Sequence, residues 1–475
     1  MTEILGKQTM NAKRWQILSV ISIMQLVLLL DATVVNVALP QIKHDLGLTD
    51  GSLTWVVNAY LIAAGSLLLL GGRIGDAYGV LRIFKFGVAI FAIFSVVATL
   101  APNATLLIVG RAGQGVGEAL AAANGLAMIS LLFPSGPERG KAFGIWAGLG
   151  GLGSILGVLL SGVLTEYLSW RWIFGINIPI ILALGVAIVL VIPTFPKKIS
   201  THLDLGNACI LVFAMVAIVM AIIGTGIEQL TLLRITLLLL GALGITLVLK
   251  RCKQSEDGII PARLMTRSPR LAGYGIIAIQ AATSGALFYL GVLLMQDSLG
   301  MTPLQTGLAW LPFCLGFFPG IFLSITIEQR KSALAAAVIG LIISSLGFVL
   351  FALGVNANNY WVGMMPAMLV TAIGFGCVAP VAQSLATSDL SEADAGSGSG
   401  IATTIQQLLQ VGGVTILVSI ALAVKDDTSV VNIDSNGFMT AFLIASFVLI
   451  TGAIVVGFSR NALAPTIGEP SAEIR

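Results

Sequence analysis

The segment "LLLDATVVNVALP", residues 28–40, places one aspartate inside a long apolar run. Apolar residues extend from about residue 15 to residue 38, which is long enough for a helix to cross a bilayer. A charged side chain at the centre of a membrane helix costs about 2.5–3.5 kcal/mol on insertion scales. Asp31 is therefore expected to face a charged partner or a wet cavity rather than lipid.

The composition of the whole chain resembles that of this segment. Of its 475 residues, 57% are hydrophobic and only 10% are charged, whereas a soluble domain carries about 25% charged residues. The chain cannot cover itself with a polar surface, so we predict an all-α membrane protein. The net charge of +3 gives no reason to expect a nucleic-acid partner.

Cofactor and metal motifs are not apparent in the sequence. The four cysteines are scattered without a CxxC pair, which predicts neither a disulfide framework nor a zinc site. No GxxxxGK[ST] motif is present, so ATP is not the expected energy source. We expect no cofactor, no bound metal and no enzymatic activity.

Fourteen apolar runs are long enough to be transmembrane helices. The first is too long for the core of a signal peptide and is expected to be retained. The runs lie at about 15–38, 52–71, 83–101, 105–132, 142–166, 173–193, 205–225, 232–249, 271–296, 304–327, 333–354, 361–386, 396–424 and 438–458.

The distribution of basic residues tests this count, because cytoplasmic loops of membrane proteins are enriched in lysine and arginine. With a cytoplasmic N-terminus and alternating spans, 20 of the 25 basic residues fall inside, 4 fall outside and Arg111 falls within a span. We therefore expect a multi-pass protein of the cytoplasmic (inner) membrane with both termini in the cytoplasm.

Two short loops with similar charge patterns indicate an internal repeat. "GGRIGDAYGVLRIF" follows the second span and "SITIEQRKSA" follows the tenth, so spans 1–6 and 9–14 are interpreted as two similar halves. We predict an N-terminal six-helix bundle at 1–196, two inserted helices and a basic loop at 197–270, and a C-terminal six-helix bundle at 271–475. Parallel six-helix repeats are typical of transporters that rock about a central site.

Asp31 is the first candidate for a functional residue. It lies about 16 residues into its helix, or roughly 24 Å along the axis, which predicts a position in the outer half of the membrane. A carboxylate in such a place can exchange a proton for a cationic guest. Alternatively, Asp31 caps a helix end or pairs with Asn36, which is itself a weaker candidate for the substrate pathway.

The fourth span carries the other deeply placed charges. Arg111 and Glu118 are seven residues apart in "VGRAGQGVGEALAAANG", so they share a helix face with Gln114 and lie about 10 Å apart. Gly113 and Gly117 form a GxxxG spacing that lets a second helix approach closely. The face is either a proton relay or guest-binding wall, or a structural network between helices.

Glycine and glutamine mark two further spans. The fifth span is rich in glycine, and its glycines, among them Gly153, Gly157 and Gly162, form a bare ridge. This ridge is either a hinge at which one helix slides on another or a surface for dense packing. In the thirteenth span, a polar edge that lines a substrate pathway is expected. Its amides are Gln406, Gln407 and Gln410. Asp297, at the end of the ninth span, is either interfacial or a weaker pathway residue.

Several of these segments resemble the major facilitator superfamily, and within it the fourteen-span branch of drug:proton antiporters. "LDATVVNVALP" resembles the span-1 signature of that branch, and "IVGRAGQGVGEAL" resembles its span-4 motif, whose arginine falls on Arg111. "WRWIFGINIP", "TPLQTGLAWLP" and "AGSGSGIATTIQQ" are similar to further landmarks. "GGRIGDAYGVLR" resembles the loop motif between spans 2 and 3, with matches at Gly72, Asp76, Gly79 and Arg82.

The resemblance implies export of hydrophobic, often cationic compounds, driven by protons. It assigns proton coupling and cation recognition to Asp31, proton transfer to Arg111 and cytoplasmic gating to the loop motif. Ala77 and Val80 stand where the family usually has basic residues, which implies a thinner charge network. The Gly-Pro of the family's span-5 motif reads Gly157-Val158 here, so its proline kink is absent.

The leading hypothesis is therefore alternating-access export of amphipathic, drug-like cations in exchange for protons. The altered span-5 motif motivates an alternative in which the cargo is an endogenous metabolite or a lipid. A membrane enzyme or sensor would need a buried nucleophile, a metal cluster or a soluble domain, and the sequence suggests none. The expected partners are a small-molecule substrate, protons and the lipid bilayer, and the protein is expected to act as a monomer.

Overall fold

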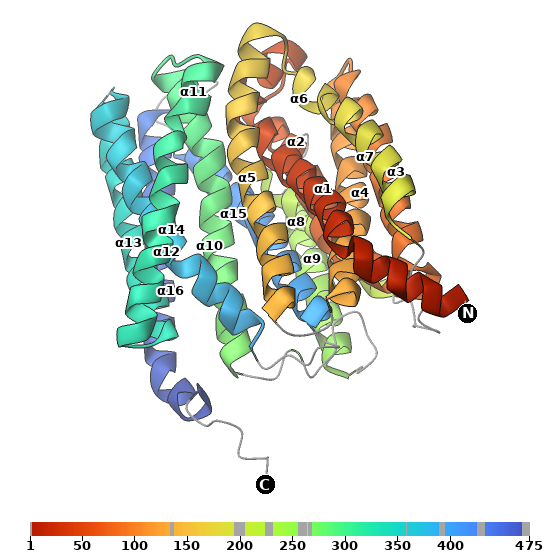
Figure 1. Ribbon diagram of the computed structural model, residues 1–475. Helices are drawn as coiled ribbons and strands as arrows, with labels where there is room; N and C mark the ends of the chain where they lie inside the picture. The colour runs from red at the N-terminus through yellow and green to blue at the C-terminus, as the bar shows by residue number, and fades with distance from the viewer. Residues whose placement is uncertain are drawn as a thin grey trace. The chain divides into compact units, whose positions relative to one another are not determined.

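The computed structural model describes residues 2–133, 137–193, 205–223, 231–254, 264, 268–357, 359–388, 395–424 and 433–467. All regular structure in these residues is helical, which suits a lipid environment because a helix satisfies its own backbone hydrogen bonds. Figure 1 shows the helices. Their order is α1 (Thr2–Leu46), α2 (Asp50–Tyr78), α3 (Val80–Thr99), α4 (Ala104–Leu132), α5 (Pro137–Tyr167), α6 (Trp172–Gly175), α7 (Asn177–Val191), α8 (Leu205–Ile223), α9 (Thr231–Gln254), α10 (Ser268–Leu293), η2 (Leu294–Ser298), α11 (Pro303–Ala309), α12 (Leu311–Arg330), α13 (Ala333–Gly354), η3 (Val355–Ala357), η4 (Tyr360–Met364), α14 (Met365–Ala386), α15 (Ala395–Ala423) and α16 (Ser435–Ile467).

The predicted number of membrane spans is confirmed. Among the described residues, thirteen helices are long and apolar enough to cross a membrane, and α5 adds a shorter apolar stretch, Leu152–Tyr167. The first span is longer than predicted because α1 continues through Pro40 to Leu46. The fold is all-helical with about fourteen spans, as the sequence indicates.

Two of the spans are broken where a proline removes a backbone donor. Pro179 cannot donate to the carbonyl of Gly175, where its ring would also clash, so α6 ends at Gly175 and α7 begins at Asn177. The predicted continuous helix at 304–327 is likewise divided between α11 and α12, and Pro312 occupies the first turn of α12. The first of these breaks positions a side chain of the candidate site.

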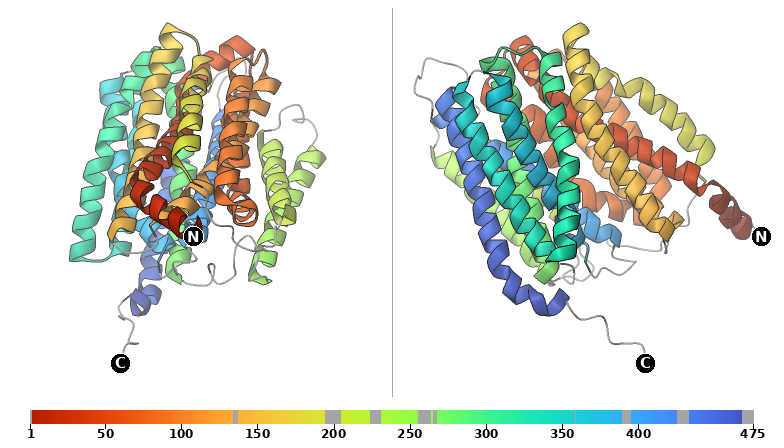
Figure 2. Two further views of the ribbon diagram at one scale, coloured as in Figure 1. Left: turned by 45° about the vertical axis from the view of Figure 1, so that its right-hand side comes forward. Right: turned by 60° about the vertical axis from the view of Figure 1, so that its left-hand side comes forward.

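The chain divides into two compact units, each made of three segments. The first boundary between them along the chain, at residue 261, lies inside the predicted inserted segment 197–270. The first unit comprises the described residues of Met1–Pro261, Gly300–Leu308 and Ser391–Val411. In it α1 packs along α5, and α4 packs against both α2 and α3. α8 and α9 lie side by side as a pair, which is clear in the left view of Figure 2, and α8 contacts α2.

The second unit comprises the described residues of Ala262–Leu299, Ala309–Leu390 and Gly412–Arg475. In it α14 packs against α12 and α13, and α13 packs against α16. Aromatic rings from these helices and α10 form a continuous cluster with neighbouring ring centroids 4.7–6.3 Å apart. Its members are Phe288, Trp310, Phe313, Phe348, Phe351, Phe375 and Phe442.

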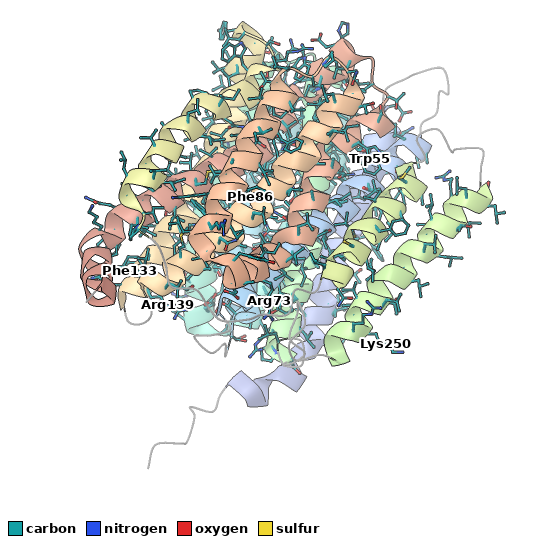
Figure 3. The ribbon with its side chains drawn as sticks, turned by 90° about the vertical axis from the view of Figure 1, so that its right-hand side faces the viewer. Trp55, Arg73, Phe86, Phe133, Arg139 and Lys250 are labelled. Carbon is teal, nitrogen blue, oxygen red and sulfur yellow. The ribbon has the colours of Figure 1, made fainter. Side chains whose placement is uncertain are left out.

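Three basic side chains of the first unit lie toward the same end of it. Figure 3 shows Arg73, Arg139 and Lys250 toward one end of this unit and Trp55 toward the opposite end. Phe86 projects from the middle of α3 and is 59% exposed, as expected for a side chain in contact with acyl chains. This distribution fits the predicted alternation of spans, and the cytoplasmic location of both termini stays a prediction.

Candidate functional site

Asp31 lies at the centre of a buried hydrogen-bond network in the first unit. Its side chain is 0% exposed and near the middle of the span Lys13–Leu46. The Oδ2 atom accepts a bond from Arg111 Nη1 at 2.6 Å. The Oδ1 atom accepts bonds from Gln114 Nε2 at 3.0 Å and Asn177 Nδ2 at 2.5 Å. Asp31 therefore faces a charged partner, as expected, and lies near the middle of a helix that extends further than predicted, to Leu46. Its depth in the membrane stays a prediction.

Arg111 is held on several sides at once. Its side chain is 1% exposed, its Nε donates to the Val56 carbonyl at 3.1 Å, and its Nη1 also donates to Gln114 Oε1 at 2.9 Å. The guanidinium carbon lies 4.1 Å from the ring centroid of Tyr60 and 5.5 Å from that of Phe174. Stacking on aromatic faces and a short carboxylate contact fix the plane of the guanidinium.

The network draws on five helices. Asp31 comes from α1, Tyr60 from α2, Ser95 from α3 and Arg111 and Gln114 from α4, and Gln114 Nε2 also donates to Ser95 Oγ at 2.9 Å. Asn177 comes from the first residue of α7, where the break before Pro179 turns it toward Asp31. The predicted shared face of Arg111 and Gln114 is confirmed, because both side chains bind the same carboxylate.

Three members of the network were not predicted from the sequence. Asn177 lies inside the quoted segment "WRWIFGINIP", but nothing in its spacing relates it to a residue 146 positions earlier. Tyr60 and Ser95 lie in apolar spans where one polar side chain carries no signal. An expected alternative, the pairing of Asp31 with Asn36, is not formed, because Asn36 Nδ2 donates at 3.2 Å to the Thr33 carbonyl of its own helix.

Glu118 lies two turns beyond Arg111 along α4 and has fewer hydrogen-bond partners than Asp31. Its side chain is 3% exposed, and Gln407 Nε2 donates to Oε1 at 3.0 Å. Its Oε2 is buried without a hydrogen-bond partner among the described residues. The Tyr60 hydroxyl interacts with the Glu118 carboxylate while donating to the Leu28 carbonyl at 3.2 Å.

Gln407 is the amide of the thirteenth span that the structure turns inward. It is 8% exposed, whereas the expected pathway residue Gln406 is exposed and Gln410 is half-buried. Gln407 belongs to the part of α15 that is grouped with the first unit. It reaches Glu118 across Gly65 of α2, where an added Cβ would lie 3.0 Å from the Cβ of Gln407.

The loop motif between α2 and α3 turns at Gly79. Its φ of +103° lies in the region that favours glycine, and the residue ends α2 and precedes α3. Gly72 and Asp76 are half-buried on α2, and Arg82 is exposed in the first turn of α3. The gating role that the family resemblance assigns to these four residues stays a prediction.

The three α5 glycines singled out from the sequence lie at close contacts between helices. An added Cβ on Gly153 would meet the backbone of Leu26, and one on Gly157 would lie 2.6 Å from the Leu30 carbonyl oxygen. At Gly162 the Pro303 carbonyl oxygen would be 2.8 Å away. Gly113 and Gly117 of α4 face Phe94 and Phe91 of α3 in the same way, which confirms the predicted close approach. The structure shows dense packing, and a hinge stays a prediction.

The remaining candidates do not join the network. Asp297 is exposed in η2, at the end of α10 in the second unit. Within the described ranges, no group of three or more His, Cys, Asp or Glu side chains could hold a metal ion. The network contains buried charged side chains. One of them, the Glu118 carboxylate, has an oxygen without a hydrogen-bond partner among the described residues.

Comparison with known proteins gives consistent matches. The Major Facilitator Superfamily profile matches residues 21–414. The lincomycin resistance protein of Streptomyces lincolnensis is 30% identical over 457 residues, which cover 96% of this chain and 93% of that protein. The puromycin resistance protein pur8 of Streptomyces alboniger is 30% identical over 476 residues, covering 97% and 95%.

Solved structures show the same fold. One is the crystal structure of a bacterial homolog of the human lysosomal transporter Spinster, in an inward-facing and unoccupied conformation. It superposes with a TM-score of 0.67 at 15% sequence identity and covers 97% of this chain and 99% of its own. At this identity the likeness describes the fold alone.

Proposed function

Because the chain belongs to the Major Facilitator Superfamily and is a multi-pass secondary transporter, we propose that it exports hydrophobic, cationic, drug-like compounds in exchange for protons. Relatives whose names refer to lincomycin and puromycin resistance support the choice of cargo class. We place the protein in the cytoplasmic membrane with both termini inside, acting as a monomer by alternating access.

The observation that carries the proposal is the buried Asp31–Arg111 pair with Glu118 nearby. Charged groups at this depth are expensive, and they persist in membrane helices where they serve transport of ions or protons. The driving force is adequate, because one charge crossing 100 mV supplies about 2.3 kcal/mol. Each pH unit adds about 1.4 kcal/mol.

The test uses the purified full-length chain in liposomes that contain a pH-sensitive dye. A hydrophobic monocation, a dication, a neutral compound and an amphipathic anion are added in turn. We expect the cations, and not the anion, to drive proton movement in the opposite direction. Asp31→Asn should abolish this coupled flux while the protein remains folded in the membrane. Absence of proton flux with every cation, or normal coupling in the variant, would contradict the proposal.

A second candidate keeps the mechanism and changes the cargo to an endogenous metabolite or a lipid. The observation that favours it is the altered span-5 motif, because Val158 is buried within an α5 that runs without the proline of the family pattern. Resistance profiling of an expressing strain against dyes, quaternary ammonium compounds and antibiotics distinguishes the two. Protection against any of them supports drug export, and protection against none supports the second candidate.

A further inference from the structure

The two buried carboxylates of the first unit differ in what neutralises them. Asp31 receives the Arg111 guanidinium and two amide donors, so both of its oxygens are satisfied. Glu118 has only neutral neighbours, the donating amide of Gln407 and the hydroxyl of Tyr60, and its Oε2 has no hydrogen-bond partner of its own among the described residues. A buried carboxylate is stable only when charge and hydrogen bonds compensate it, and here only Asp31 meets that condition.

The charged groups around Glu118 also set it apart from Asp31. The groups that face Glu118 are Asp31 from α1, Tyr60 from α2, Arg111 from its own helix and the neutral Gln407 from α15. Asp31 and Arg111 neutralise each other at 2.6 Å. An ionised Glu118 therefore leaves one uncompensated negative charge in the interior of the unit, and a proton on Glu118 makes the cluster neutral.

The hydrogen bonds around Glu118 fit the protonated acid. The Tyr60 hydroxyl lies between the Leu28 carbonyl and Glu118, and when it donates to that carbonyl at 3.2 Å its oxygen can accept a hydrogen bond from Glu118. A protonated Glu118 can donate to that oxygen while its carbonyl oxygen accepts from Gln407. An ionised Glu118 would instead accept from the Tyr60 hydroxyl, which would then give up its bond to the Leu28 carbonyl.

Asp31 is poorly suited to carry an exchangeable proton. Its protonation would remove the counter-charge of Arg111, a guanidinium that is 1% exposed and cannot lose its own proton. Breaking a buried ion pair on one side leaves a costly unpaired charge. The pair is therefore expected to remain ionised while Glu118 changes its charge.

We propose that Glu118, oriented by Gln407, exchanges its proton for one positive charge of the cargo, and that Asp31 is the fixed counter-ion of Arg111. This inference rests on the proposed function and narrows its cargo to monocations. In the exchange the O–H bond of the Glu118 carboxylic acid breaks, the proton leaves to water, and the cation pairs with the carboxylate. No electrons are transferred.

The first experiment counts protons released when tetraphenylphosphonium binds to the purified full-length protein in weakly buffered detergent solution. We expect about one proton per bound cation in the wild type, as linkage requires for a single displaced proton. Glu118→Gln should release none and bind the cation at least about tenfold more weakly, a loss of roughly 1.4 kcal/mol. Phe348→Ala in the aromatic cluster of the second unit is the control and should leave proton release in place.

The outcomes separate the two proposals. Proton release that persists in Glu118→Gln would mean that another group exchanges the proton and would overturn the inference alone. A wild type that binds the cation without releasing protons would overturn the proposed function, and the inference with it. The single variant Asp31→Asn is expected to lose coupling, because Arg111 would then pair with Glu118.

Infrared spectroscopy of the protein without any cation gives a second readout, taken as the difference between the wild-type spectrum and that of Glu118→Gln, and it does not depend on cation binding. A carboxylic-acid carbonyl band should be present in the wild type and absent in Glu118→Gln. Gln407→Leu should shift the frequency of this band, because it removes the amide that donates to Oε1. If Gln407 acted through packing alone, Gln407→Leu would leave the frequency of the band unchanged. An identical band in Glu118→Gln would contradict the assignment.

Discussion

The buried side chains of the two units differ in charge and polarity. In the first unit the buried side chains include Asp31, Arg111 and Glu118 in mid-span positions. In the described part of the second unit, the buried polar side chains are hydroxyls apart from Arg270 in the first turn of α10. These hydroxyl residues are Thr283, Ser324, Ser344, Ser345, Thr371, Thr415 and Ser446.

The aromatic cluster of the second unit shows that helices in lipid need no buried charge to pack. Lipid tails are as apolar as leucine, so packing there depends on van der Waals contact, which the rings of Phe348 and its neighbours provide. The charges of the first unit are therefore not explained by packing. Within the described residues the buried carboxylates are confined to the first unit, which suggests that ion exchange and apolar packing are divided between the two units.

The largest effect is expected from Arg111→Ala. This change leaves Asp31 buried without its counter-charge, which should destabilise the protein by about 3–5 kcal/mol. Thermal unfolding of the purified protein measures the loss, and Lys85→Ala at an exposed position of α3 is the control. Equal stability of the two variants would mean that the buried pair is not a coupled unit.

A smaller loss of stability is expected from Phe348→Ala in the second unit. The ring contacts Phe351, Phe375 and Phe442 at 6.2 Å between centroids. The loss should be about 2–3 kcal/mol, below the 3–5 kcal/mol that is usual in water-soluble cores, because the reference solvent is lipid. Proton release on cation binding should be unchanged. Its disappearance in this variant would break the division between the units.

Next in size is the effect of crowding the contact between α1 and α5. Gly153→Ala places a methyl group against the Leu26 backbone and should cost about 1–3 kcal/mol as overpacking. Gly148→Ala on the same helix is a matched control, because its added methyl group meets nothing within 4 Å. Unfolding temperatures of the two variants provide the comparison, and similar values would show that α1 and α5 adjust freely.

The smallest effect is expected at the ion pair of Arg14 and Glu138. The two side chains are 2.9 Å apart, but they are 28% and 47% exposed. Exposed pairs contribute about 0.2–1 kcal/mol, so Arg14→Ala should lower stability within that range, and high salt should erase the difference. A loss as large as that of Arg111→Ala would remove the contrast between buried and exposed charge pairs.

The sequence predicted the spans and one part of the site, and the reasons are physical. Hydropathy and basic loops determine spans, and helical periodicity places Arg111, Gln114 and Glu118 on one face of α4. Periodicity within one helix does not specify how that helix is rotated against another. Gln406 and Gln407 differ by about 100° around the axis, so the sequence could not indicate which of them reaches Glu118.

The partners contributed by other helices were missed for a related reason. Asn177 reaches Asp31 only because the chain breaks before Pro179 and turns that amide inward. Tyr60 joins the site through its position beside both Arg111 and Glu118. Such contacts depend on tilt and depth, which an apolar sequence leaves open.

The pH dependence of tetraphenylphosphonium binding tests the central claim most directly. Proton and cation compete for Glu118, so the dissociation constant should fall as pH rises, approaching about tenfold per pH unit where one proton is displaced. The slope should vanish in Glu118→Gln and persist in Phe348→Ala of the second unit. A wild type whose affinity does not change with pH, or a Glu118→Gln variant that keeps the wild-type slope, would contradict the account.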